Sequence, residues 1–120
     1  MLLQGKTVLI VEPEAFSAYA LESQFRGMNA DRVVRATHVE EGLLLVEEMP
    51  EIDLAIVDCD QFHESGTRLA ARLREHGIKV VRTVREITEP RASDAGTPVS
   101  KPYFMIDIER AVAAQYGQVI

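Results

Sequence analysis

The stretch Ile52-Asp53-Leu54-Ala55-Ile56-Val57-Asp58 decides the fold class of this 120-residue chain. It is a short apolar run, with β-branched residues, that stops abruptly at an acid. Such a run is typical of a strand buried on both faces, which favours a central place in a parallel sheet. The sequence therefore predicts a buried strand at 52–57 with the carboxyl group of Asp58 at its end.

Two other apolar runs also end at a charged residue. Val8-Leu9-Ile10-Val11 is followed by Glu12, and Val99-Ser100 is followed by Lys101-Pro102. Open α/β sheets bind their ligands at the carboxyl ends of the strands. We therefore expect Glu12, Asp58 and Lys101 to share one charged pocket at one edge of the sheet.

The rest of the chain alternates strand-like and helix-like segments. Strands are predicted at 7–11, 32–36, 52–57, 78–81 and 97–100, and the more polar 32–36 is expected at an edge. Helices are predicted at 14–26, from 37 or 38 until Pro50 ends it, at 67–75 and at 103–116, with a polar loop at 60–66. This alternation predicts an α/β protein built from βαβ units around a parallel sheet.

The helix patterns also predict which side chains are buried. In the first helix Phe16, Ala20 and Phe25 are expected to face the core, while Glu22 and Gln24 face water. The stripe expected in the core from the last helix is Phe104, Ile108, Val112 and Tyr116. The exposed flank of that stripe leaves a homodimer open as an alternative.

Composition and charge exclude several function classes. The chain has 13 basic and 19 acidic residues, a net charge of −6, which disfavours a nucleic-acid surface. No apolar run is long enough to span a membrane, and the first residues do not resemble a signal peptide. With one cysteine, Cys59, there is no internal disulfide. We therefore expect a single cytoplasmic domain over residues 1–120.

Other chemistry finds little support in the sequence. Neither G-x-G-x-x-G nor G-x-x-x-x-G-K-[ST] follows the first strand, and Glu12-Pro13-Glu14 would repel a phosphate there. This argues against a nucleotide-binding enzyme. His38, His63 and His76 are dispersed without metal-ligand spacing and are expected at the surface. Cys59 is expected to be a partly buried side chain rather than a nucleophile.

Taken in order, these elements resemble the receiver domain of bacterial two-component response regulators, the CheY-like family. The resemblance covers nearly the whole chain. It is carried by the block 53–58, by Gly66 eight residues after Asp58, by Leu69 and Leu73, and by Lys101-Pro102 before an aromatic-rich last helix. It implies a flavodoxin-like α/β/α fold, doubly wound around a five-stranded parallel sheet of strand order 2-1-3-4-5. The Lys101-Pro102 bond is expected to be cis.

The resemblance also implies a function in phosphorelay signal transduction. Asp58 would accept a phosphoryl group from a histidine kinase or phosphotransfer protein. Lys101 would bind phosphoryl oxygens, and Thr83 would report the phosphate through its hydroxyl. Mg²⁺ would be held by Glu12, by Asp58 and by the backbone carbonyl of Asp60. The phosphoprotein would signal by contact with a downstream protein target, with no enzymatic activity beyond self-phosphorylation and autodephosphorylation.

Several positions depart from the family pattern and mark an atypical receiver. Pro13 stands where the family has an acidic metal ligand, and the side chain of Asp60 is a candidate substitute. Val84 replaces a small residue, and Pro98 replaces the aromatic residue of the usual switch. The segment between Thr83 and Lys101 is short and contains Pro90, so the fourth helix is predicted to be short, distorted or missing. The alternative is a degenerate pseudo-receiver, a binding module that works without phosphorylation.

Overall fold

The computed structural model describes residues 2–87 and 96–118. Along the chain it contains the following elements: β1 (Thr7–Val11), α1 (Ala15–Gly27), β2 (Arg32–Ala36), α2 (Val39–Glu48), β3 (Ile52–Asp58), α3 (His63–Glu75), β4 (Lys79–Val84), β5 (Thr97–Ser100) and α4 (Met105–Gln115). The five strands form one parallel sheet in the order β2-β1-β3-β4-β5. The predicted fold class and strand order are confirmed.

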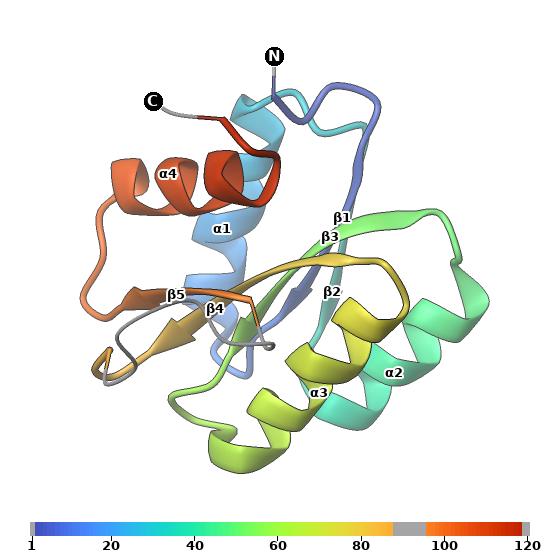
Figure 1. Ribbon diagram of the computed structural model, residues 1–120, viewed down its shortest axis with the longest axis vertical. Coiled ribbons are helices and arrows are strands. Elements are labelled where there is room, and N and C mark those ends of the chain that lie inside the picture. The colour runs from blue at the N-terminus through green and yellow to red at the C-terminus, as the bar shows by residue number, and fades with distance from the viewer. Residues whose placement is uncertain (1, 88–95, 119–120) are drawn as a thin grey trace.

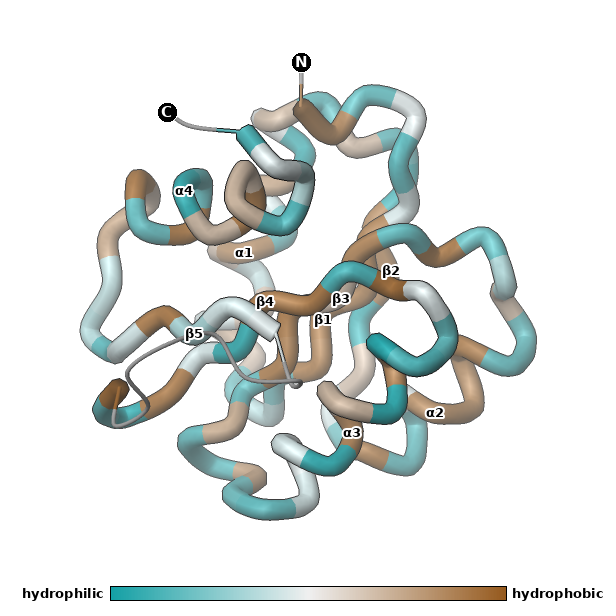
Figure 2. The backbone as a smooth tube through the Cα atoms, in the orientation of Figure 1, coloured by the Kyte–Doolittle hydropathy of each residue, from teal (hydrophilic) through white to brown (hydrophobic). Residues whose placement is uncertain are grey.

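The sheet is covered on both faces, which makes three layers. Helices α1 and α4 lie on one face, and α2 and α3 lie on the other (Figure 1). Hydrophobic residues concentrate in the central strands (Figure 2). Along β3 the side chains alternate between two cores, because Leu54 and Ile56 belong to the α1/α4 side while Ala55 and Val57 belong to the α2/α3 side. The prediction that 52–57 is a central strand buried on both faces is confirmed.

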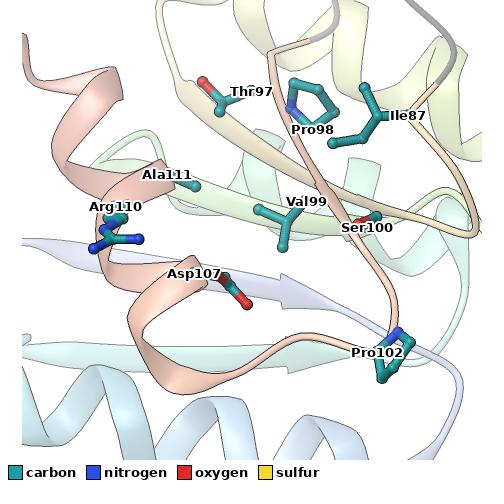
Figure 3. Close-up of a pocket in the computed structure, with 9 residues that line it drawn as sticks. All are labelled: Ile87, Thr97, Pro98, Val99, Ser100, Pro102, Asp107, Arg110 and Ala111. Carbon is teal, nitrogen blue, oxygen red and sulfur yellow. The ribbon is translucent and has the colours of Figure 1, made fainter.

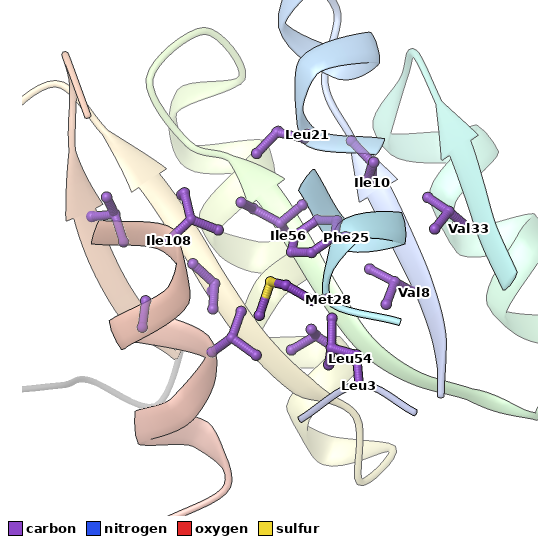
Figure 4. Close-up of a cluster of buried hydrophobic side chains, with 14 of the residues drawn as sticks. Leu3, Val8, Ile10, Leu21, Phe25, Met28, Val33, Leu54, Ile56 and Ile108 are labelled. Carbon is purple, nitrogen blue, oxygen red and sulfur yellow. The ribbon is translucent and has the colours of Figure 1, made fainter. Parts of the chain in front are cut away.

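The core under α1 and α4 is built from all three layers of that side. Leu21 and Phe25 of α1 pack with Ile56 of β3 and with Ile108 of α4 (Figure 4). Burial of each of these side chains contributes roughly 1.5–3 kcal/mol to the stability of the fold relative to leaving it exposed. The core therefore fixes where both helices sit relative to the strand that carries Asp58.

The predicted buried side of α1 is wrong in part. Phe25 is fully buried, but Phe16 is 79% exposed and Ala20 is exposed as well. Gln24, expected in water, is 7% exposed and donates from Nε2 to the carbonyl of Met105 at 2.7 Å. The reason is the helical period: with Phe25 in the core, Ala18 and Leu21 share its face.

The ends of three other elements differ from prediction. Helix α3 begins at His63, so the loop expected at 60–66 is shorter. Strand β4 extends to Val84, beyond the predicted 81. Helix α4 begins at Met105, and Phe104 precedes it with 78% of its surface exposed. Phe104 is thus no part of the core stripe, because its backbone is extended and lies outside the helical period; Ile108 and Val112 are fully buried, as expected.

Two further expectations concern single segments. The bond Lys101-Pro102 is cis, as predicted. The prediction of a short, distorted or missing fourth helix falls on 88–95, which lie outside the described residues. In the part of the chain that is described, no helix has the length and apolarity needed to cross a membrane.

Candidate functional site

The strand register brings the predicted site residues to one edge of the sheet. Asp58 at the end of β3 is paired with Thr83 of β4. The ladder continues past the strands, since the Lys101 amide donates to the carbonyl of Val84 at 2.8 Å. On the other side of β3, Val11 pairs with Val57, so Glu12 emerges beside Asp58. Parallel strands end at the same edge, which is why four residues from four strand ends meet there.

Asp58 is the centre of this site and is only 1% exposed. Its Oδ1 accepts three interactions: from Lys101 Nζ at 3.0 Å, from the Thr83 hydroxyl at 3.3 Å and from the Asp60 amide at 3.0 Å. Its Oδ2 is buried and has no hydrogen-bond partner among the described residues. A buried carboxylate oxygen without a partner is costly, so its presence points to a ligand that binds there.

Lys101 contacts both Asp58, at the end of β3, and Asp60, in the loop that follows. Besides its contact with Asp58, its Nζ lies 3.6 Å from Oδ2 of Asp60. Partial burial of the ammonium group lowers its pKa, but the hydrogen bond and the charge of Asp58 outweigh that effect and raise the pKa above the ordinary value. The lysine is therefore a fixed positive charge at neutral pH.

Glu12 is buried beside Asp58, with 2% of its surface exposed. Burial raises the pKa of its carboxyl group, and the negative charge of Asp58 adds to the rise. The amide of Glu14, which donates to Oε2 at 3.0 Å, and the charge of Lys101 act in the opposite direction. The negative charge of Asp58 thus disfavours the charged form of Glu12, and a bound cation would offset this effect.

Gly66 explains how α3 can pass close behind Asp58. A Cβ at this position would lie 3.0 Å from the carbonyl oxygen of Asp58 and 3.0 Å from the Cβ of Phe62. Any larger residue would push the helix away from the end of β3. The glycine noted in the sequence therefore has a packing role next to the site.

Two residues of the site were missed by sequence reasoning. Arg85 Nε pairs with Asp60 Oδ1 at 3.3 Å, so both oxygens of Asp60 face cations. Tyr103 is half-buried; burial raises its pKa, and the negative charge of Glu12 adds to this. Arg85 and Tyr103 each lie two residues beyond a predicted site residue, but in the irregular segments that follow β4 and β5, where a sequence pattern does not state which way a side chain points.

The residues present fit a magnesium ion only with few protein ligands. In the ranges 2–87 and 96–118, no cluster of three acidic, histidine or cysteine side chains has metal-binding geometry. Pro13 offers no side-chain ligand, and the carboxylate of Asp60 is engaged by two cations. Among the described side chains of the site, what remains is Oδ2 of Asp58 and the carboxyl group of Glu12. Because Mg²⁺ is commonly held by one or two carboxylates plus phosphate and water, this pair is compatible with it.

The positions that depart from the family pattern line the neighbouring surfaces. Pro98 pairs in register with Arg82 on the edge strand β5 and lines a cavity of about 340 Å³ between β5 and α4 (Figure 3). No aromatic side chain is among the described residues that line it. Val84 is half-buried and lines a second cavity together with Asp60 and Arg85. The histidines predicted at the surface are all exposed, and Cys59 is buried.

Comparison with known proteins gives a consistent result for the fold. No family model matches the chain, and no curated protein matches it. Solved structures do match. A chain of the CheX–CheY–BeF3–Mg²⁺ complex from Borrelia burgdorferi has a TM-score of 0.79 at 19% identity, over 92% of this chain and 89% of that one. A response regulator from Thermotoga maritima has a TM-score of 0.76 at 20% identity, over 94% and 98%.

A third match shows the same fold inside a larger protein. A probable two-component response regulator/GGDEF domain protein has a TM-score of 0.80 at 21% identity; the match covers 97% of this chain but 51% of that one. At these identities the likeness concerns the fold, and it extends over nearly all of the sequence. The chain therefore has the receiver fold of two-component response regulators.

Proposed function

We propose that this receiver accepts a phosphoryl group on Asp58 and signals by contact with other proteins. The proposal rests on the different surroundings of the two oxygens of Asp58. Oδ1 is held by three donors, including Lys101 at 3.0 Å, while Oδ2 is buried without a partner. A carboxylate fixed by one oxygen and unsatisfied at the other is prepared to form a bond there.

The transfer can be written with all atoms accounted for. Oδ2 of Asp58 attacks the phosphorus of a phosphohistidine on a histidine kinase or phosphotransfer protein. The O–P bond forms as the P–N bond breaks, and the released imidazole nitrogen keeps the electron pair and takes a proton from water. The product is an acyl phosphate on Asp58. Such a transfer is catalysed mainly by positioning and by charge stabilisation.

The chain's own residues supply both effects. Lys101 is a fixed cation beside the acceptor, and its Nζ is close enough to bind an oxygen of a phosphoryl group on Asp58. The hydroxyl of Thr83, now 3.3 Å from Oδ1, can donate to the same group. Mg²⁺, held by Glu12, Asp58 and the backbone carbonyl of Asp60, would neutralise the remaining negative charge.

We further propose that residues 1–120 act as one cytoplasmic domain.

A phosphodonor assay tests the proposal directly. The chain is incubated with acetyl phosphate and Mg²⁺, and its intact mass is measured. We expect a gain of one phosphoryl group in the wild type and in Asp31→Asn, an exposed acid remote from the site, and no gain in Asp58→Ala. No adduct with any divalent cation, or an equal adduct in Asp58→Ala, contradicts the proposal. Unchanged Mg²⁺ affinity in Asp60→Asn would exclude the Asp60 side chain as a metal ligand.

A second candidate is a pseudo-receiver that binds partners without phosphorylation. The observations that favour it are Pro13, which has no ligand to give, and Pro98, which lines the β5–α4 cavity without an aromatic neighbour there among the described residues. In this case Asp58 and Lys101 serve as a buried ion pair that holds the strand ends together. The same mass measurement separates the two functions, because a pseudo-receiver gains no phosphoryl group.

A further inference from the structure

The face formed by α1 and α4 carries an apolar groove that the phosphoacceptor chemistry does not use. The two helices lie side by side on the same face of the sheet (Figure 1). Between them is a cavity of about 540 Å³, with walls made by Phe16, Tyr19, Tyr103 and Met105 and with Leu21 and Met28 below. Phe16, Tyr19 and Met105 are 79%, 66% and 64% exposed. Large apolar side chains gathered around a hollow mark an interaction site.

The groove is bounded by hydrogen-bonded and packed residues. Gln24 of α1 is buried and donates from Nε2 to the carbonyl of Met105 at 2.7 Å, which fixes the distance between the helices. Beneath it, Leu21 and Met28 belong to the main core. A preformed groove of this kind loses little conformational entropy when it is filled.

The charge of the groove indicates what fills it. The charged side chain that lines it is Glu109, and the exposed Glu14 begins the helix that carries Phe16. Neither acid forms an ion pair within the described residues. The nearby Arg26 of α1 is already paired with Glu22 at 2.9 Å. An occupant that complements this face has apolar side chains flanked by lysine or arginine.

A second copy of the chain is a poor occupant for the same reason. A two-fold interface sets identical patches against each other. It would bring Glu109 of both copies toward one apolar contact, where like charges are costly. The chain's net charge of −6 adds to the repulsion.

We propose that the α1/α4 groove binds a basic amphipathic helix of a partner protein, with apolar residues at i, i+3, i+4 and i+7 seated between Phe16 and Met105. This mode places a helix in a groove between two helices. The inference deepens the proposed function, since it rests on signalling by protein contact, and it names the surface and the chemistry of the partner. It does not require phosphorylation of Asp58.

Two synthetic helical peptides of about 20 residues test the groove. One combines leucine on the apolar face with lysine on the flanks, and the other has glutamate in place of lysine. Each carries one tryptophan on its apolar face. The chain itself contains no tryptophan, so the fluorescence emission of the peptide reports binding directly. We expect the lysine peptide to bind and the glutamate peptide to bind at least about tenfold more weakly.

Surface variants locate the binding. The double variant Phe16→Ser/Met105→Ser should weaken binding by about tenfold or more, and Glu109→Lys should weaken the lysine peptide and strengthen the glutamate peptide. The matched control is Leu44→Ser, which removes another exposed apolar side chain, 57% exposed on α2. All these positions are at the surface or only half-buried, and thermal unfolding verifies that each variant folds. Leu44→Ser should bind like the wild type.

The outcomes separate this inference from the proposed function. No binding of the lysine peptide, equal binding of both peptides, or equal loss in Leu44→Ser overturns the inference. A dimer of the chain that Phe16→Ser/Met105→Ser dissolves overturns it as well, because the occupant is then a second copy. Asp58→Ala should bind the lysine peptide like the wild type. A failed phosphorylation assay therefore does not affect the result of the peptide assay, and a failed peptide assay does not affect the phosphorylation result.

Discussion

The contact between Lys101 and Asp58 provides the sharpest test of the site. Replacing the lysine, in Lys101→Met, keeps the length of the side chain but removes its charge. Asp58 stays 1% exposed and loses the cation at 3.0 Å. Removing one partner of a buried ion pair typically costs about 3–5 kcal/mol, because the other charge is left in the protein without compensation.

Two features of the structure reduce that figure. The side chain of Lys101 is 24% exposed, so water already screens part of the interaction. Asp58 also keeps two donors, the Thr83 hydroxyl and the Asp60 amide. We therefore expect Lys101→Met to lower the free energy of unfolding by about 2–3 kcal/mol. For a chain of this size the melting temperature should fall by roughly 8–12 °C.

Urea unfolding of four proteins measures the effect: the wild type, Lys101→Met, Asp58→Asn and the double variant. Once Asp58 is neutral, the loss of Lys101 should cost little, so the double variant should be more stable than the sum of the single effects predicts, by about 1–2 kcal/mol. The matched control is Arg68→Met, which breaks an exposed ion pair of 3.6 Å and should change stability by less than about 0.5 kcal/mol.

The pH dependence adds an independent criterion. The pKa of Lys101 is raised in the folded state, so its stabilising effect is complete below the ordinary value of 10.5 and is lost as the pH rises through the higher folded value. The gap between wild type and Lys101→Met should therefore persist at neutral pH and close only in strong alkali. Additive single effects, or a gap no larger than that of Arg68→Met, would refute the reasoning.

Three other predictions concern the site and its support. Glu12→Gln should be more stable than the wild type at pH 7, and the difference should vanish as the pH falls through the raised folded pKa of Glu12 toward 4.5, as urea unfolding at several pH values can measure. Gly96→Ala should cost more than about 2 kcal/mol, since φ is +102° and a Cβ there would collide with a backbone carbonyl of β4; Gly27→Ala, with open space around it, should be neutral or stabilising in the same melts. Phe25→Ala should lose about 3–5 kcal/mol and Phe16→Ala less than about 0.5 kcal/mol; equal losses would show that the face of α1 is assigned wrongly.

Much of the fold was readable because strand and helix patterns differ in period. The strands at 7–11, 32–36 and 97–100 match their predicted bounds, and the central strand was recognisable because both of its faces are apolar. The site followed from the same reading. A charged residue follows the predicted strands at 7–11, 52–57 and 97–100, and the carboxyl ends of parallel strands lie at the same edge of a sheet. Asp58 and Lys101 were therefore expected at one edge, where the structure places them in contact.

The helix faces were harder to predict. Apolar residues at 16, 20 and 25 suggested one face for α1, yet the structure places Phe16 outside and Gln24 inside. A sequence pattern does not state which of two apolar stripes faces the sheet. The choice depends on α4, whose backbone offers a carbonyl to Gln24 and whose side chains complete the core.

By itself the sequence determined the parallel sheet, its central strand and the set of charged groups at its edge, because hydrophobic period is a local property and the alternation of strands with helices favours parallel strands. Only the tertiary structure decided how those groups share their contacts. Lys101 joins Asp58 to Asp60, and Arg85 completes the network. One oxygen of Asp58 is left buried without a described partner. Such partnerships depend on contacts of 3.0–3.6 Å between segments far apart in the chain, and no sequence pattern contains these distances.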